Sequence, residues 1–269
     1  MPGKKQIKVD FQIDSIDTEL RNGLWNVISM CFIDPMCRKT WLFESDFKNI
    51  ITAIWFSFFK EPIDEISDHN QTIKSHLRKR FFSWHYLQVY DFIDFIASIK
   101  NAPYNQDRLT DAFNVILERE LSAYRFVNNQ LVQITSTQEV EEIEEAILKS
   151  NKYSSVNTHL NSALILLSDR KNPDYRNSIK ESISAVESIC KIFTKNNKAT
   201  LGEALNKLEK DFGLHPALKK SFSSLYGYTS DDAGIRHALT ENDRDIDFHE
   251  AKFILVTCSA FTNFLISKM

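Results

Sequence analysis

The sequence predicts a mainly helical protein. Its 269 residues include only six Gly and six Pro, the residues that most often interrupt helices. Apolar residues recur at spacings of three and four over long stretches, which is the periodicity of a buried helix face. Hydrophobic residues make up 43% of the chain, enough for a substantial core, and the length suits one large domain or two ordinary ones.

Four helices are predicted in the first half of the chain. Asp17 is placed to cap the first of them, and Glu19 suits its first turn. The second contains four aromatic residues between positions 55 and 59, which indicates burial on more than one face. The polar segment 61–74 that follows is broken by Pro62. The predicted helical ranges are about 20–31, 45–59, 79–99 and 107–122.

A small β-hairpin is predicted at residues 124–134. Two short runs of strand-forming residues flank Asn128 and Asn129, and asparagine tolerates the positive φ angles of a two-residue hairpin turn. Ser136 and Glu139 then have the spacing of a capping box that opens the next helix. The acidic run on that helix is expected to be a solvated face, and it consists of Glu141, Glu142, Glu144 and Glu145.

A domain boundary is expected near residue 150, because the stretch 149–155 is polar and lacks helical periodicity. This divides the chain into an N-terminal helical domain, 1–150, and a C-terminal helical domain, 151–269. The first contains 17 Lys and Arg against 22 Asp and Glu, whereas the second contains 16 against 14. The C-terminal domain is therefore the more compatible with a polyanion such as RNA.

The C-terminal domain is predicted to be a helical bundle of five helices. Apolar stripes over 156–167 and 179–193 mark the first two, and a stripe over 254–265 marks the last. Proline suits the first position of a helix, and Thr or Asp followed three residues later by Glu suits a cap. The residues expected to open the second to fifth helices are Pro173, the pair Thr200 and Glu203, Pro216, and the pair Asp247 and Glu250.

Missing motifs exclude several functional classes. The four cysteines include no C-x-x-C pair, so neither a disulfide framework nor a zinc site is expected, and Cys190 and Cys258 are interpreted as buried thiols. There is no phosphate-binding glycine loop, no G-x-S-x-G and no H-E-x-x-H. Neither a signal core nor a run of about 18 apolar residues occurs. We therefore expect a cytoplasmic protein that uses no metal or other cofactor and contacts no membrane.

The most informative stretch is the turn-rich segment 227–239, which precedes the last helix. It contains Asp231 and Asp232, and then an adjacent Arg236 and His237. Histidine is the side chain most easily poised for proton transfer near neutral pH, and arginine is best suited to gripping a phosphate. The pair therefore fits chemistry on a phosphate ester. The alternative is structural, with His237 capping or packing and Arg236 paired with one of the aspartates.

Five stretches of the C-terminal domain carry a family resemblance: 172–187, 198–203, 225–231, 234–239 and 251–261. The fourth reads Gly-Ile-Arg-His-Ala-Leu. Together they resemble the HEPN domains of the AbiJ-like abortive-infection proteins of bacteria. Two further stretches, 20–25 and 120–128, resemble the N-terminal domain that often precedes this HEPN type.

The resemblance implies a four-to-five-helix bundle that often dimerises and, in many members, is a metal-independent RNase. Its motif is an arginine, a polar residue, and a histidine four to six residues after the arginine, at the start of the last long helix. The histidine transfers a proton and the arginine holds the phosphate. These roles are carried over to His237 and Arg236. The spacing departs from the motif, because the residues five and six positions before His237 are Asp232 and Asp231.

A literal match to the motif spacing does occur at Arg244 and His249. It lies at the predicted capping pair of the last helix, after the expected loop, and is interpreted as a chance match. Exposure to water is the simplest expectation for His249.

Other residues receive supporting roles under this hypothesis. Asn177 and Glu181 are four residues apart on one helix and are placed either to orient the histidine or simply to be exposed. Asp231 and Asp232 are supporting residues within the loop. The phosphate contacts are expected to come from basic residues that could equally lie on solvated helix faces. These residues are Arg176, Lys180, Lys219 and Lys220.

Two functions are therefore predicted. The leading hypothesis is a phage-defence or toxin-type endoribonuclease that acts on RNA, such as tRNA or rRNA, as a homodimer and without a metal. The alternative is a non-catalytic HEPN-like module that dimerises or binds RNA, a nucleotide or a regulatory protein partner. The family context favours the nuclease, whereas the altered motif favours the binding module.

Overall fold

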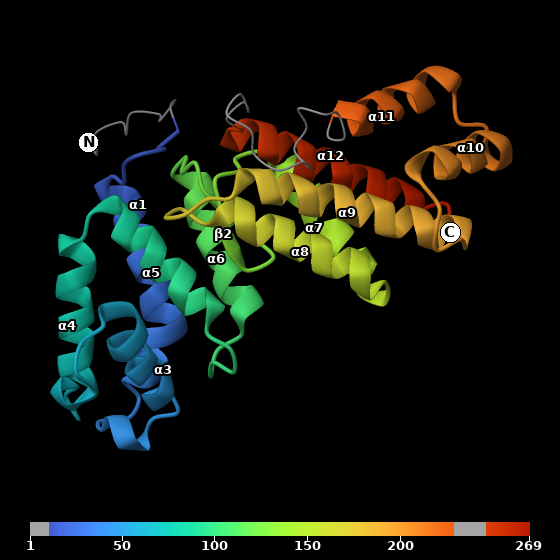
Figure 1. Cartoon of the computed structure of the whole chain (residues 1–269). Helices are drawn as coiled ribbons and strands as arrows, with labels where there is room; N and C mark the ends of the chain where they lie inside the picture. The colour runs from blue at the N-terminus through green and yellow to red at the C-terminus, as the bar shows by residue number, and fades with distance from the viewer. Residues whose placement is uncertain (1–10, 229–245) are drawn as a thin grey trace. The chain divides into compact units, whose positions relative to one another are not determined.

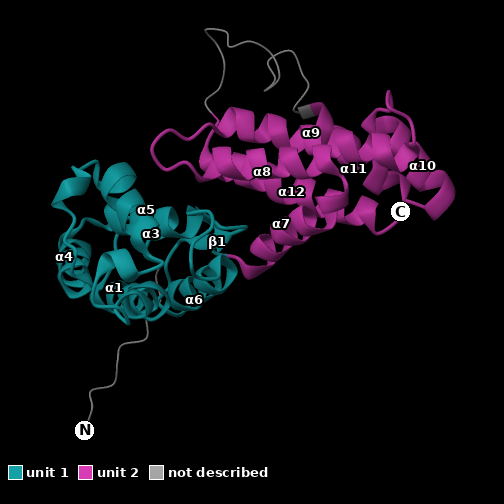
Figure 2. Ribbon diagram, turned by 90° about the horizontal axis from the view of Figure 1, so that it is seen from below, with its two compact units in different colours: residues 1–135 teal, residues 136–269 magenta. Residues whose placement is uncertain are grey.

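Residues 11–228 and 246–269 are described by the computed structural model, which Figure 1 colours from the N-terminus to the C-terminus. The described part is mainly helical with one two-stranded antiparallel hairpin, so the predicted fold class is confirmed. Two compact units divide the chain into 1–135 and 136–269 (Figure 2). The division falls before the expected boundary near 150, because the helix at Thr137–Lys149 packs on the last helix of the second unit.

Unit 1 is built from short helices and the hairpin. Asp17 caps its first helix as predicted, because the carboxylate accepts a hydrogen bond from the backbone N–H of Leu20 at 2.8 Å. The second predicted helix changes to π-helical geometry and ends at Lys60, whose φ is 57°. The elements in order are α1 (Thr18–Ile28), η1 (Ser29–Ile33), α2 (Asp34–Met36), η2 (Leu42–Glu44), α3 (Lys48–Ala53), η3 (Ile54–Phe59), η4 (Ile63–Glu65), α4 (Asn70–Ser83), α5 (Tyr86–Ser98), α6 (Gln106–Arg119), β1 (Arg125–Val127) and β2 (Gln130–Val132).

The prediction of one continuous helix over 79–99 was wrong. Helix α4 ends at Ser83 and α5 begins at Tyr86, because Trp84 is extended and breaks the helical path. The backbone N–H of His85 donates to the side chain of Gln88 at 3.1 Å, which stabilises the start of α5. The apolar stripe runs across this break, so periodicity alone did not reveal it.

The β-hairpin forms where it was predicted. Strands β1 and β2 pair with Phe126 opposite Leu131, and Asn128 and Asn129 make the turn with φ angles of 46° and 62°. Asn114 of α6 holds the hairpin, because its side chain accepts from the N–H of Phe126 at 2.7 Å and donates to its carbonyl at 2.9 Å. The hairpin is thereby fixed to α6 rather than projecting freely.

The core of unit 1 is rich in aromatic rings. Phe81 is fully buried, and its ring centroid lies 5.3 Å from that of Trp25 and 6.3 Å from that of Phe92. Helices α1 and α6 approach closely at Gly23, where an added Cβ would lie 2.5 Å from Cγ2 of Ile116. The contact therefore requires the absence of a side chain at this position.

Unit 2 is a bundle of longer helices. Helices α8 and α9 run side by side, and α12 packs along α9 and α7 (Figure 1). The predicted openings at Pro216, Thr200 and Asp247 are confirmed. Pro173 is not the first helical residue of α9, because Asp174 caps that helix. The elements in order are α7 (Thr137–Lys149), η5 (Ser150–Lys152), α8 (Ser154–Ser168), α9 (Tyr175–Thr194), α10 (Leu201–Phe212), α11 (Pro216–Tyr228) and α12 (Phe248–Ile266).

The capping box predicted at the start of α7 is only half formed. The hydroxyl of Ser136 accepts from the N–H of Glu139 at 3.3 Å, as expected. The Glu139 carboxylate, however, accepts from Nζ of Lys252 at 2.9 and 3.1 Å and so joins α7 to α12. Glu142 belongs to the acidic run and is half-buried, because its carboxylate accepts from the amide of Asn263 at 3.0 Å. The other three acids of the run are exposed, as expected of a solvated face.

Candidate functional site

The centre of the predicted site lies outside the described residues. It comprises Asp231, Asp232, Arg236 and His237, and Arg244 of the literal motif match lies in the same stretch. The structure does describe the helices that flank this stretch, α11 before it and α12 after it. Both contact α9: the hydroxyl of Tyr226 donates to the Glu187 carboxylate, and α12 packs along α9.

The N-termini of α9 and α12 lie close together. The rings of Tyr175 and Phe248 meet edge to face with centroids 6.0 Å apart. Burial, and secondarily the negative charge of Asp247, raises the pKa of the Tyr175 hydroxyl. Asp174 and Asp247 cap the two helices by accepting backbone N–H groups at 3.0 and 2.9 Å. Since a carboxylate already occupies each cap, neither helix end is an open anion site.

The two residues expected to orient His237 have other partners among the described residues. The side-chain amide of Asn177 donates to the Asp174 carboxylate at 2.7 Å and so contributes to the cap of α9. Oε2 of Glu181 accepts a 2.8 Å hydrogen bond from Nδ1 of His159 on α8. Their role toward His237 stays a prediction.

The four predicted phosphate contacts differ in their surroundings. Lys219 forms a 2.6 Å ion pair with Glu209, which offsets its charge. Lys220, the next residue on α11, is exposed. Arg176 and Lys180 are half-buried on the first turns of α9. The basic groups therefore divide between two helices, and the charge of Lys219 is already paired with that of Glu209.

His159 is the titratable residue that sequence reasoning missed. It lies on α8, four residues after Ser155 and three before Ser162, so these three polar side chains share one helix face. The spacing of four and three residues between Ser155, His159 and Ser162 was the sequence signal that could have identified this polar helix face. Its partner Glu181 was recognised, but the two are 22 residues apart in the chain and only packing brings them together.

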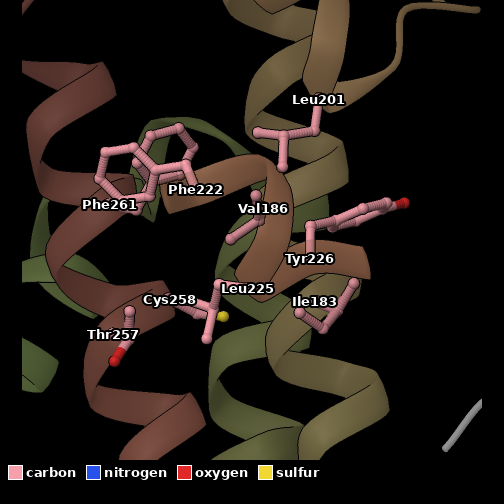
Figure 3. Close-up of a pocket in the computed structure, with 9 residues that line it drawn as sticks. All are labelled: Ile183, Val186, Leu201, Phe222, Leu225, Tyr226, Thr257, Cys258 and Phe261. Atoms are coloured by element: carbon pink, nitrogen blue, oxygen red, sulfur yellow. The ribbon is translucent and has the colours of Figure 1, made fainter. Parts of the chain in front are cut away.

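A mostly apolar hollow that opens to solvent lies between α9, α10, α11 and α12, and the space within it, open solvent included, is about 290 Å³ (Figure 3). Figure 3 shows the Cys258 thiol directed toward Leu225 in this hollow. Burial raises the pKa of Cys258 and of Cys190 to about 12, so both thiols stay protonated near neutral pH and are poor nucleophiles. The expectation of two buried thiols is confirmed, and the hollow does not resemble a phosphate site.

No group of three His, Cys, Asp or Glu side chains suited to hold a metal occurs among the residues that the structure describes. Within the ranges 11–228 and 246–269, every helix is too short or too polar to cross a lipid bilayer.

Residues 2–149, more than half of the chain, match the family model of AbiJ N-terminal domain 4. The chain belongs to the AbiJ family. Membership places it among abortive-infection proteins, which act in phage defence, and the resemblance of its N-terminal stretches to AbiJ is confirmed. No curated protein and no solved structure matches the chain.

The AbiJ match extends beyond unit 1 and ends with the last residue of α7. By sequence, α7 therefore belongs to the AbiJ domain, whereas by packing it belongs to unit 2. Its contacts with α12 are specific, since Glu139 pairs with Lys252 and Glu142 with Asn263. Helix α7 is thus the AbiJ element that continues into the C-terminal bundle.

Proposed function

We propose that this AbiJ-family chain is a metal-independent endoribonuclease whose C-terminal unit is a HEPN-type bundle. The main support is the resemblance of 172–187 and 234–239 to HEPN proteins. The first stretch coincides with the N-terminal part of α9, and the second precedes α12 in the chain. The convergence of these two helix ends at Tyr175 and Phe248 is consistent with a site built there.

The proposed chemistry is transfer of a phosphodiester within the RNA. The ribose 2′-hydroxyl attacks the adjacent phosphorus and the bond to the 5′ oxygen breaks, which leaves a 2′,3′-cyclic phosphate and a free 5′-hydroxyl. His237 would transfer one of the two protons, either taking it from the 2′-hydroxyl or giving it to the leaving oxygen, and water would accept or supply the other. Arg236 would hold the non-bridging oxygens as their negative charge grows. A hydroxyl nucleophile of this kind, supplied by the substrate, needs no bound metal.

The test is incubation of the purified protein with total tRNA and rRNA in EDTA. His237→Ala and Arg236→Ala should each abolish cleavage, with only a small change in thermal stability. His249→Ala is the matched control, because His249 is exposed in the first turn of α12 and should be neutral. Cleavage that depends on added magnesium or manganese would contradict the mechanism. Loss of activity in His249→Ala alone would instead assign the site to the literal motif.

A homodimer formed through unit 2 is part of the proposal. One Arg and one His provide few contacts to a polyanion. A two-fold symmetric dimer would double the number of basic groups. Light scattering at micromolar protein should give twice the mass of one chain. A monomer under these conditions would remove this part of the proposal.

The altered spacing of Arg236 and His237 favours a second function, a non-catalytic HEPN-like module. Such a module would bind RNA, a nucleotide or a regulatory protein partner through the same unit. One experiment distinguishes the endoribonuclease from the non-catalytic module. RNA that is bound but left intact by the wild-type protein, with binding lost in Arg236→Ala, would support the module.

A further inference from the structure

Lysines gather at the C-terminal end of α9, where the chain leads into α10 (Figure 1). Residues 188–202 contain three lysines and no Asp or Glu. Lys191 lies in the last turn of α9, and Lys195 and Lys198 lie in the connection to α10. Helix α10 contributes a fourth lysine, Lys207. We call these four residues the α9-end lysine cluster.

Hydrogen bonds hold the cluster at this end of the helix. The backbone N–H of Asn196 donates to the carbonyl of Lys191 at 3.1 Å, so the connection folds back on the last turn of α9. The N–H of Lys198 donates to the side chain of Asn196 at 3.0 Å and tightens the connection further. Nζ of Lys207 donates to the carbonyl of Phe193 at 2.8 Å, which places α10 against the same helix end. The four lysines therefore surround one end of α9.

The positive charges of the cluster are not neutralised by ion pairs. None of the four lysines forms an ion pair with a residue that the structure describes. The two acids that flank residues 188–202 have other partners, because Glu203 caps α10 and Glu187 accepts from the Tyr226 hydroxyl. Two of the lysines are exposed and two are half-buried. A negatively charged ligand can therefore reach the cluster.

The end of α9 does not need this many lysines for its own stability. The last carbonyls of the helix already accept hydrogen bonds from the N–H of Lys195 and from Nζ of Lys207. The negative end of the helix dipole attracts a cation, and Lys207 supplies one there. Further lysines repel one another, since like charges four residues apart, as in Lys191 and Lys195, destabilise a helix. A ligand with several negative charges would relieve this repulsion.

The groups of the cluster suit the phosphates of a nucleic acid. Lysine ammonium groups and asparagine amides are common donors to phosphate oxygens, and Asn196 and Asn197 are exposed between the lysines. The donors surround a helix end instead of converging in a pocket, which suits a chain of phosphates better than a single nucleotide. A membrane-binding surface would need apolar side chains beside the lysines, and residues 194–198 include no apolar residue.

We propose that the α9-end lysine cluster binds the phosphate backbone of RNA; this inference rests on the proposed function for the identity of its ligand. Helix α9 has 20 residues, so its two ends are about 30 Å apart. The contact between Tyr175 and Phe248 lies at the opposite end of α9. The cluster thus binds RNA away from the expected reacting bond and strengthens the binding of long RNA without taking part in the chemistry.

The first experiment measures binding in the absence of cleavage. The ligand is a 2′-O-methylated RNA hairpin, which has no 2′-hydroxyl nucleophile. The triple variant Lys191→Gln, Lys195→Gln, Lys198→Gln should raise Kd about tenfold near 0.1 M salt. It should also lower the slope of log Kd against log salt concentration by about 2 to 3, because each phosphate contact contributes about 0.9 to that slope. An unchanged Kd and slope would overturn the inference.

A matched control variant removes the same charge elsewhere. Lys48, Lys60 and Lys100 are exposed lysines of unit 1, and their replacement by Gln should leave Kd close to the wild-type value. Equal weakening by both triple variants would show that only the total charge matters and would overturn the inference.

The single variant Lys195→Gly separates binding from folding. Lys195 has a φ of 57°, which glycine adopts without strain, so the variant should not unfold at a lower temperature than the wild type. It should raise Kd about threefold, as expected for one phosphate contact out of several. Lys60 also has a φ of 57°, and Lys60→Gly is the control that should leave Kd unchanged. Equal effects of the two glycine variants on Kd would contradict the assignment.

The second experiment measures cleavage in EDTA with two substrates. For tRNA, the triple variant should raise KM about tenfold and leave kcat unchanged. A tetranucleotide should be cleaved at the wild-type rate, because a stacked strand advances about 3.4 Å per nucleotide and four nucleotides do not span α9. A lower kcat with an unchanged KM would overturn the inference. If neither RNA is cleaved, the proposed function fails, and the binding experiment still decides the inference.

Competition distinguishes RNA from other anions. Polyglutamate and phosphatidylserine vesicles, added at the same total charge as the RNA, should displace little of the bound hairpin. Displacement by polyglutamate would assign the cluster to an acidic protein partner, and displacement by vesicles would assign it to an anionic membrane. Either result would overturn the inference.

Discussion

Unit 1 and unit 2 are stabilised by different kinds of core. In unit 1, aromatic rings contact one another in a continuous group that includes Trp25, Phe58, Phe81, Trp84 and Phe92. The core of unit 2 is mainly aliphatic, with leucines and isoleucines from α8, α9, α10 and α12. Large rigid rings fill space at few positions, so unit 1 can combine short and irregular helices with a dense interior.

The polar contacts differ in the same way. In unit 1, the side-chain amide of the buried Asn70 donates to the carbonyls of Met36 and Lys39 at 3.1 and 2.9 Å, and so fixes a loop. In unit 2, charged or titratable side chains pair between helices, as Lys252 does with Glu139. In the example from unit 1 a buried amide holds backbone carbonyls, whereas in the example from unit 2 two charged side chains join neighbouring helices.

The largest expected effect is removal of an aromatic ring from unit 1. Phe81→Ala should lower the free energy of unfolding by about 4 kcal/mol, because it leaves a cavity among four other rings. Leu164→Ala in unit 2 should cost about 3 kcal/mol. Urea denaturation followed by tryptophan fluorescence and circular dichroism measures both. Phe56→Ala, at a 71% exposed position, is the control and should be nearly neutral. A smaller loss for Phe81→Ala than for Leu164→Ala would contradict the contrast between the two cores.

Two glycines in helices should respond to alanine with opposite signs. Gly23→Ala should lower stability by about 2 kcal/mol, because the added methyl overlaps Ile116 and overpacking outweighs the gain in helix propensity. At Gly202 on α10 an added Cβ meets only Oγ1 of Thr200, at an ordinary 3.7 Å, so Gly202→Ala should raise stability by about 0.5–1 kcal/mol. Thermal unfolding of both variants measures the difference. Stabilisation by Gly23→Ala would show that α1 and α6 can separate easily.

The ion pairs of the two units should differ in strength. Lys252 and Glu139 are 21% and 29% exposed, so Lys252→Ala should cost about 1 kcal/mol. Lys74 and Asp34 of unit 1 are 33% and 57% exposed, so Lys74→Ala should cost close to zero, about 0.2 kcal/mol. A double-mutant cycle with Glu139→Gln isolates the first pair. Equal coupling energies for both pairs would remove this contrast.

The smallest effect concerns pH. The pKa of His76 in unit 1 is lowered, mainly by burial and then by the positive charge of Arg80. The unfolded chain therefore binds more protons at this site, so its contribution to stability is present above about pH 6.5 and is lost as the pH falls through the lower folded pKa. Denaturation at pH 7.5 and 5.5 should show a smaller pH dependence for His76→Leu than for the wild type. His249→Leu is the control in unit 2, and an unchanged pH dependence in His76→Leu would refute the assignment.

Local signals in the sequence predicted local structure well. Asp17, Thr200 and Asp247 cap helices as expected, and Asn128 and Asn129 make the predicted turn. Each of these features depends on residues within a few positions of one another. Hydrogen-bonding and φ preferences are sufficient to specify such features.

Features that depend on tertiary packing could not be predicted in this way. The break at Trp84 lies within an uninterrupted apolar pattern, and Glu139 had a plausible local partner but pairs with Lys252, 113 residues away. The same holds for the candidate site: Glu181 was recognised as a polar helix residue, but its contact with His159 is a product of helix packing. Periodicity in the sequence identifies the apolar and polar faces of each helix, but only tertiary packing determines which faces of different helices come into contact.

Helix α11 is less deeply packed in unit 2 than α12 is. Its inward side chains Phe222, Leu225 and Tyr226 are only half-buried, whereas α12 is anchored by buried residues from Ala251 to Leu265. These two helices are the covalent attachments of the stretch 229–245. Helix α11 is therefore the less deeply packed of the two attachments, and the hydrogen bond from the Tyr226 hydroxyl to the Glu187 carboxylate links it to α9.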